Sequence, residues 1–241
     1  MFNLRRLPLF LVLASLLIGT AAYAQQAADF CRARLKATAV DLSSQVDDGF
    51  LKHMKRIGIK TVIRYYDLED ETFDGKSITP RERVLIKKHG FKLGVVFQHH
   101  SNRIASFTPR SGLRDAKRAV VMAHAMRQPR GSTIYFGVDN NWDSDHALNA
   151  VTRYFKVAKR VVTAGGYHVG VYGSGLVCDT IRGKNLAQKC WLSNAKSWPG
   201  YADYYRSQQW HMLQTREGVC AGHPVDFDIV NRRFADYGQF D

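Results

Sequence analysis

The feature that most constrains this chain is a regular alternation of short apolar runs with longer amphipathic runs. KTVIRYYDL (60–68), for example, precedes TPRERVLIKKHG (79–90), which starts with a Thr cap and a proline and ends in glycine. Strands that alternate with helices imply right-handed crossovers and a parallel sheet. The predicted strands are 38–44, 60–68, 91–100, 132–139, 167–175, 189–195, 210–215 and 225–231. The predicted helices are 47–58, 79–90, 112–129 and 145–166.

Eight strands in about 200 residues fit a closed α/β barrel of the (β/α)₈ TIM type, with irregular helices in its second half. The alternative is a doubly wound open sheet, which ordinarily carries a Gly-rich phosphate loop after its first strand. The segment DLSSQVDDG (41–49) follows the first predicted strand here, and it is not such a loop. The sequence therefore favours the barrel.

The first 24 residues have the three-part plan of a secretory signal peptide. Arg5 and Arg6 precede an apolar stretch over 7–18, and small residues lead to Ala24. The apolar stretch is shorter than the roughly 20 residues that a membrane span needs, so a retained anchor is the less favoured alternative. We predict cleavage after Ala24, one barrel domain over 25–241, and an exported protein, periplasmic or secreted, without stable membrane insertion.

The chain is strongly basic, with a formal net charge of +14. Such a charge favours anionic partners, which for an exported protein are acidic lipid surfaces and acidic cell-wall polymers rather than nucleic acid. A role in solubility alone is an equally open interpretation.

Four cysteines remain after the signal peptide is removed. An even number in an exported chain suggests two disulfides, for which three pairings are possible. We favour Cys178 with Cys190, which closes a short loop, and Cys31 with Cys220, which ties the two ends of the domain together. The chain has no Cys-x-x-Cys spacing, so a zinc site or a redox motif is not expected.

In a (β/α)₈ barrel the active site lies at the carboxyl ends of the strands. TIYFGVDNNWD (133–143) ends a buried run in Asp139, and the next predicted helix starts near Asp145. This spacing favours a functional role for Asp139 over helix capping. Because strand side chains alternate, Asp139 is expected to share a face with Asn141.

Two further groups of polar residues have competing interpretations. Asp226 and Asp228 share a face of the last predicted strand, and for Asp228 a purely structural anchoring role is equally open. His99 and His100 end the third predicted strand, and either of them, together with the Asp cluster, would supply the ligands of a metal-dependent phosphodiesterase. Adjacent strand residues point to opposite faces, which disfavours that alternative, and we predict no metal and no organic cofactor.

The motifs VIRYY, IYFGVD, HVGVYGSG, CWLSNAKSW and VDFDIVN occur in this order over roughly residues 38–231. This series resembles the glycoside-hydrolase-like domain family formerly listed as domain of unknown function 1906. That family is similar in turn to the family 25 glycoside hydrolases, the muramidases that cleave peptidoglycan. The resemblance implies an exported glycoside-hydrolase-like protein that acts on cell-wall glycan.

The muramidases are similar to this chain at an Asp on the first strand (here Asp41), at an Asp-x-Glu on the fourth (here Asp139 and Asn141), and at an Asp near the last (here Asp226). Two acids at i and i+2 on one strand can divide a glycosidic cleavage between them. Asn141 occupies the Glu position, and an amide cannot donate a proton as a general acid. Three alternatives follow. Asp139 acts as the acid with Asp41 or Asp226 as its charged partner, Glu69 replaces the missing acid, or the chain binds glycan without cleaving it.

We therefore predict a muramidase-like glycoside hydrolase, with a noncatalytic cell-wall glycan-binding protein as the alternative. The predicted partner is cell-wall glycan, foremost peptidoglycan, and we expect a monomer. The predicted catalytic residues are Asp139, Asp41, Asp226 and Glu69. The predicted substrate-binding residues are Arg64, Tyr65, Gln98, Asn141, Tyr172, Trp191 and Gln214.

Overall fold

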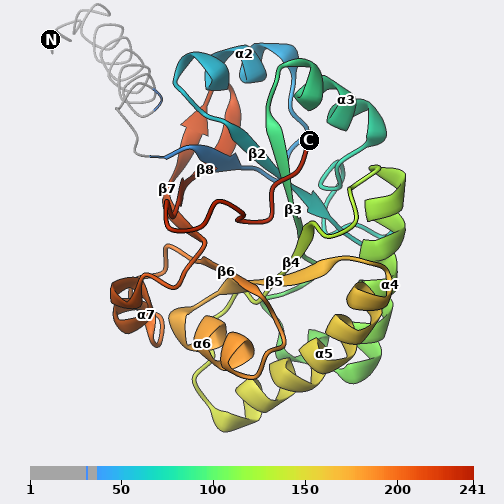
Figure 1. Ribbon diagram of the computed structural model, residues 1–241, viewed down its shortest axis with the longest axis vertical. Coiled ribbons are helices and arrows are strands. Elements are labelled where there is room, and N and C mark those ends of the chain that lie inside the picture. Colours follow the sequence, from blue (N-terminus) through green and yellow to red (C-terminus); the bar gives the residue numbers. More distant parts are fainter. Residues whose placement is uncertain (1–30, 32–36) are drawn as a thin grey trace, which may run out of the picture.

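The computed structural model describes Cys31 and residues 37–241, which form a closed barrel of eight strands in sequential order with helices around it (Figure 1). The strands are β1 (Ala39–Asp41), β2 (Thr61–Tyr66), β3 (Lys92–Phe97), β4 (Thr133–Gly137), β5 (His168–Gly173), β6 (Lys189–Leu192), β7 (Met212–Cys220) and β8 (His223–Val230). The helices are α2 (Asp48–Arg56), α3 (Pro80–Lys88), η1 (Ile104–Ser106), α4 (Pro109–Ala125), α5 (Asp145–Ala164), α6 (Gly175–Gly183) and α7 (Tyr201–Ser207). The predicted (β/α)₈ class is confirmed.

The four predicted helices are present, and each starts at a side-chain cap. In α3 the hydroxyl of Thr79 accepts from the backbone N–H of Glu82 at 3.1 Å, with Pro80 in the first turn. Asp139 caps no helix, since Ser144 caps α5. The sequence analysis did not predict α6 or α7. Both are short and lie in the half of the ring where irregular helices were expected.

The last strand departs from the predicted parallel sheet. β8 runs antiparallel to both of its neighbours, β7 and β1. A turn at Ala221 and Gly222, with φ of 50° and 85°, joins it to β7, and such a pair of positive φ angles matches the twist of a tight hairpin. β7 consequently extends to Cys220, beyond the predicted end at residue 215. The reversed direction brings Asp226 level with Asp41 and puts Asp228 two register pairs deeper in the barrel.

The barrel is filled inside and closed at one end. Its interior holds a compact apolar cluster, whereas a larger cluster packs the strands against the helices. At the amino ends of the strands the C-terminal segment crosses the barrel, where Phe240 pairs with Leu93 through bonds of 2.7 and 2.9 Å (Figure 1). The hydroxyl of Tyr237 bonds that of Thr61 at 2.6 Å, beside the start of β2. The opposite end, at the carboxyl ends of β1 to β7, is the one that remains open.

Both predicted disulfides are confirmed. The first disulfide joins Cys31 to Cys220, at the tip of the β7–β8 hairpin, and the second, Cys178–Cys190, joins α6 to β6. Loop closure of this kind stabilises a fold mainly by restricting the unfolded chain.

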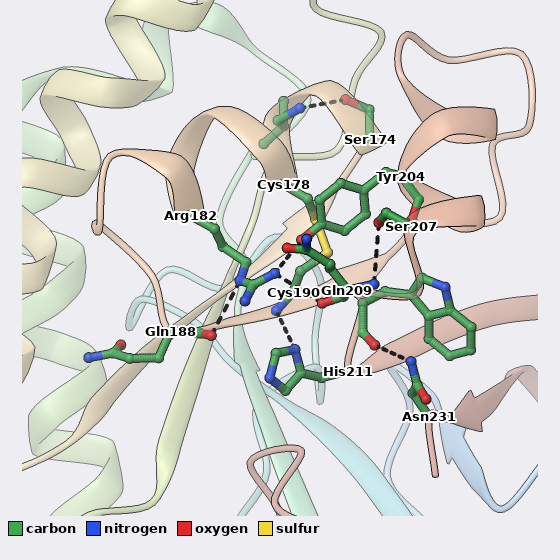
Figure 2. The surroundings of a disulfide bond; sticks show 12 residues. Ser174, Cys178, Arg182, Gln188, Cys190, Tyr204, Ser207, Gln209, His211 and Asn231 are labelled. Carbon is green, nitrogen blue, oxygen red and sulfur yellow. Dashed lines mark hydrogen bonds between the residues drawn. A yellow bond between two sulfur atoms is a disulfide. The ribbon is translucent and has the colours of Figure 1, made fainter. Parts of the chain in front are cut away.

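Arg182 reinforces the second disulfide (Figure 2). Its guanidinium donates to the hydroxyl of Tyr204 at 2.7 Å and to the carbonyls of Gln209 and Gln188 at 3.0 and 3.3 Å. These bonds connect α6 with α7 and with the residues that precede β6 and β7.

The predicted signal peptide, residues 1–24, lies outside the described residues. Within the described part of the chain, no helix combines the length and the apolar character that crossing a membrane would require.

Candidate functional site

Three adjoining cavities lie across the open end of the barrel. The β1 cavity, about 390 Å³, lies between β1 and the β7–β8 hairpin. The central cavity, about 160 Å³, lies over the barrel interior, and the β6 cavity, about 350 Å³, lies against the loop after β6. Asp226 borders all three, and the central cavity shares Tyr65 with the first and Asp139 with the last. They therefore form one elongated hollow, the mouth cleft.

Five charged residues line the mouth cleft. Four of them are the acids Asp41, Asp139, Glu217 and Asp226, and the fifth is the cation Lys76. Three of the acids lie in one row across neighbouring strands. Asp226 on β8 is the register partner of Asp41 on β1 and of Glu217 on β7. Side chains that face each other across paired strands have Cβ atoms about 5 Å apart, so the fold forces like charges together here.

This crowding changes the protonation of Asp226. Burial, followed by the negative charges of Glu217 and Asp139, raises the pKa of Asp226 from 3.8 to about 6. The amide of Gln214 donates to its Oδ2 at 3.0 Å. Asp226 is therefore a carboxyl that holds its proton into the mildly acidic range.

Asp139 faces different partners. Burial raises its pKa, whereas the ammonium of Lys76 and a hydrogen bond from Gln98 at 3.3 Å oppose that rise. Its backbone N–H bonds the carbonyl of Ser101 at 3.0 Å, which fixes the chain just after β4. Compared with Asp226, Asp139 is the acid with a nearby cation to stabilise its charge.

Asp41, which borders the β1 cavity, and Asp228, which lies deeper in the barrel, form a buried pair. Burial, and then the charge of Asp226, raises the pKa of Asp41 well above its usual value, although Tyr65 donates to it at 2.8 Å. Burial, and then the charge of Asp41, raises the pKa of Asp228 well above normal. One oxygen of Asp228 accepts from the indole N–H of Trp191 at 2.8 Å, and Oδ2 finds no donor within residues 37–241. Burial and mutual repulsion therefore both favour the protonated forms of these two carboxyl groups.

Most of the predicted substrate-binding side chains come together in the cleft. Tyr65, Gln98, Tyr172, Trp191 and Gln214 all border the central cavity. Gln214 links them to the acids, because it accepts from the hydroxyl of Tyr172 at 3.0 Å and donates to Asp226 and, at 3.4 Å, to Asp41.

Arg64 and Glu69 do not belong to the cleft. Arg64 is fully buried on the outer side of β2, where its Nε lies 2.6 Å from Glu82 and its Nη1 donates to the carbonyl of Leu42 at 2.5 Å. It therefore cannot orient substrate, because side chains alternate along a strand and Tyr65 takes the inward position. Glu69 has an 86% exposed side chain, pairs with Arg118 on α4 and borders none of the three cavities.

Asn141 also differs from expectation. β4 ends at Gly137, so the strand alternation that would align Asp139 with Asn141 does not reach these residues. Asn141 is exposed and borders none of the three cavities, and its backbone N–H bonds the side chain of Asn140 at 2.7 Å.

The alternative metal site has little geometric support. Nδ1 of His99 bonds Asp67 at 2.6 Å. Within the described residues, the one group of three candidate ligands close enough to share an ion is Cys31, His53 and Cys220, whose two cysteines are joined in a disulfide.

Sequence reasoning missed Lys76 and Glu217. Lys76 comes from the loop between β2 and α3, is 3% exposed, and donates to Gln98 O at 2.5 Å and to Thr72 Oγ1 at 2.7 Å. Nothing in the sequence around Lys76 indicates that this side chain reaches the central cavity. Glu217 had a usable signal, since Ala221-Gly222 between two alternating runs indicates the hairpin that carries it.

Comparisons with known proteins identify the family of the chain and its fold. The chain is 27% identical over 194 residues to the uncharacterized protein YbfG of Bacillus subtilis strain 168. The alignment covers 76% of this chain but only 26% of that protein. The chain thus spans about a quarter of the length of this curated relative.

Two solved structures share the fold. The Tat-secreted protein Rv2525c of Mycobacterium tuberculosis superposes with a TM-score of 0.71 at 20% identity, covering 85% of this chain and 99% of that one. The autolysin LytC of Streptococcus pneumoniae, solved with a synthetic peptidoglycan ligand, gives a TM-score of 0.54 at 15% identity, covering 80% of this chain and 46% of that one. The family described as "Rv2525c-like, glycoside hydrolase-like domain" matches residues 52–229. This match covers most of the chain and includes the cleft acids Asp139, Glu217 and Asp226, and the chain belongs to that family.

Proposed function

We propose that the protein is an exported glycoside hydrolase that cleaves cell-wall glycan, foremost peptidoglycan, in the mouth cleft. The observation that carries this proposal is the contrast between Asp226 and Asp139. Burial raises the pKa of both carboxyl groups. At Asp226 the nearby acids add to the rise and bring the pKa to about 6, whereas at Asp139 the ammonium of Lys76 and the hydrogen bond from Gln98 oppose it. A glycosidase needs one protonated and one charged carboxyl, and different surroundings are how a fold supplies both.

The proposed roles differ from the expectation that Asp139 is the acid. Asp226 donates its proton to the glycosidic oxygen, and the bond from that oxygen to the anomeric carbon breaks. Asp139, ionised, stabilises the positive charge that develops on the sugar ring. Gln214 positions Asp226, and Tyr65 and Tyr172 line the cavity beside it. Addition of water to the sugar returns a proton to the acid.

The shape of the cleft supports a polymeric substrate. Three cavities in a row can hold successive sugar units, whereas a single closed pocket would suit a small ligand. The peptidoglycan ligand of LytC supports a cell-wall polymer, and the two disulfides support export to an oxidising compartment.

The test is release of reducing ends from purified peptidoglycan, with binding to the same polymer measured in parallel. Wild type should release them, and Asp226→Asn and Asp139→Asn should each lower the rate at least about 100-fold while the polymer still binds. Glu69→Gln is the matched control outside the cleft and should be unchanged.

A noncatalytic glycan-binding protein is the second candidate, favoured by the amide Asn141 where the related muramidases have Glu. Binding by wild type without any release of reducing ends would leave this candidate and refute the hydrolase. Asn141→Glu should change the rate less than about twofold, because its side chain is exposed away from the cleft.

A further inference from the structure

The β6 cavity has an unusual charge for a protein with a net charge of +14. Three of the residues that line it are acids, Asp139, Glu217 and Asp226, and none is Lys, Arg or His. Of the three cavities, Lys76 borders only the central one, and its Nζ also lies 3.4 Å from the carboxylate of Asp67. The β6 cavity therefore repels anionic groups and attracts cations.

Glu217 is the acid of this cavity with the greatest freedom to meet a ligand. It lies on the exposed part of β7, and within residues 37–241 no ion pair or side-chain hydrogen bond holds its carboxylate. Because Asp226 is its register partner on β8, a cation between the two strands would contact both carboxyl groups.

A second observation points to a ligand in the same place. Ser193 borders the β6 cavity and is 1% exposed, yet its Oγ has no hydrogen-bond partner among the described residues. An unpaired buried hydroxyl costs free energy that a bound polar group would recover. The half-buried indole of Trp198 borders the cavity as well and offers the apolar surface of a sugar-ring contact.

We propose that the β6 cavity binds a sugar ring that carries a protonated amine, a 2-amino-2-deoxy sugar without its N-acetyl group, and that Glu217 selects it. The ammonium lies between Glu217 and Asp226, a ring hydroxyl bonds Ser193 Oγ, and the ring packs on Trp198. This inference rests on the glycan binding of the proposed function but not on hydrolysis. A neutral N-acetylated ring fits the same space without the two charge-assisted bonds.

The test is calorimetric binding of the mature chain to three probes at near-neutral pH: a glucosamine tetramer, an N-acetylglucosamine tetramer and a lysine-containing tripeptide. The glucosamine tetramer should bind about tenfold more tightly than the acetylated one, as expected for hydrogen bonds to charged groups. Raising the salt concentration should reduce this advantage, because the pair is partly exposed.

Glu217→Gln is the informative variant, since an exposed isosteric change leaves the fold intact. It should remove most of the advantage of the glucosamine tetramer and leave the acetylated tetramer unchanged. Glu69→Gln makes the same chemical change outside the cleft and should alter neither affinity.

Equal affinities of wild type for the two tetramers would overturn the inference, as would an equal loss for both in Glu217→Gln. Tripeptide binding as tight as that of the glucosamine tetramer would overturn the assignment to a sugar. Selective glucosamine binding without any hydrolysis of peptidoglycan would uphold this inference and refute the hydrolase. Hydrolysis of peptidoglycan without selectivity for the glucosamine tetramer would refute this inference and uphold the hydrolase.

Discussion

Replacing Asp226 by Asn should stabilise the fold above about pH 6. The folded protein holds the pKa of Asp226 at about 6, above its ordinary 3.8. Between these two pH values the unfolded chain loses the proton whereas the folded protein keeps it, so stability falls as the pH rises. Below 3.8 both states carry the proton and Asp226 costs nothing. Above about pH 6 both have lost it and the cost is constant.

The magnitude follows from the size of this window. A difference of about 2 pH units, at about 1.4 kcal/mol for each, gives a cost of about 3 kcal/mol at neutral pH. Asn carries no charge and removes this cost, but it can lose the hydrogen bond from Gln214, which is worth about 1 kcal/mol. The net gain is about 2 kcal/mol, which corresponds to a rise in Tm of about 4–8 °C for a domain of this size.

The assay is urea unfolding of wild type and Asp226→Asn at pH 4 and at pH 7.5, with both disulfides intact. The variant should be equal to wild type or slightly less stable at pH 4, and about 2 kcal/mol more stable at pH 7.5. Asp203→Asn, at a side chain on α7 that is 85% exposed, is the control and should show no such change between the two pH values. A stability difference that is the same at both pH values would refute the reasoning, since it would show that Asp226 ionises freely in the fold.

Three other perturbations test the site and the scaffold. Release of reducing ends should fall as the pH rises through about 6, because Asp226 then loses the proton that it donates; a rate that climbs across this range would exclude it as the acid. Arg64→Met should lower the free energy of unfolding by about 3–5 kcal/mol in urea, because it leaves a buried carboxylate without its partner, and glycan affinity of the folded variant should be unchanged. Gly175→Ala should lower the free energy of unfolding by about 3 kcal/mol or more, measured by thermal unfolding, since its Cβ would lie 2.1 Å from the carbonyl oxygen of Gly200. Gly183→Ala in the same helix has open space around the added Cβ and should be neutral or stabilising.

The sequence was sufficient for the barrel because its evidence is periodic. The sequence pointed to a closed barrel through its alternating strand and helix runs, its helix caps such as Thr79 and the lack of a Gly-rich loop after the first strand. The structure confirms this architecture. The direction of β8 was not predicted, because the rule for parallel strands assumes a helical crossover and the hairpin at Ala221-Gly222 replaces it. α6 and α7 were missed because short helices held by a disulfide and by Arg182 need little amphipathic pattern.

At the site, the position of a residue along its strand predicted how close it lies to the open end of the barrel. It did not predict whether the side chain points into the barrel or outward. Asp41 and Asp139 reach the cleft, as their places at the carboxyl ends of strands suggested, and Asp226 reaches it because β8 runs antiparallel to β1. Arg64 does not, because pleat alternation points it outward to a buried Glu that is distant in sequence. Lys76 could not be found from the sequence, since its place depends on how one loop folds back over the barrel and not on a pattern within it.

The raised pKa values of four buried acids at and beneath the mouth cleft support the proposed function over a purely structural role for them. The fold raises the pKa values of Asp41, Asp139, Asp226 and Asp228 mainly by burial, so the ionised acids oppose folding at neutral pH. Neutral amides would relieve that opposition at no cost in volume. A purely structural mouth would therefore accumulate Asn at these positions, whereas proton donation and charge stabilisation both require the acid. The closed amino end and the disulfide at the hairpin tip supply stability elsewhere, which allows the cleft to keep its acids.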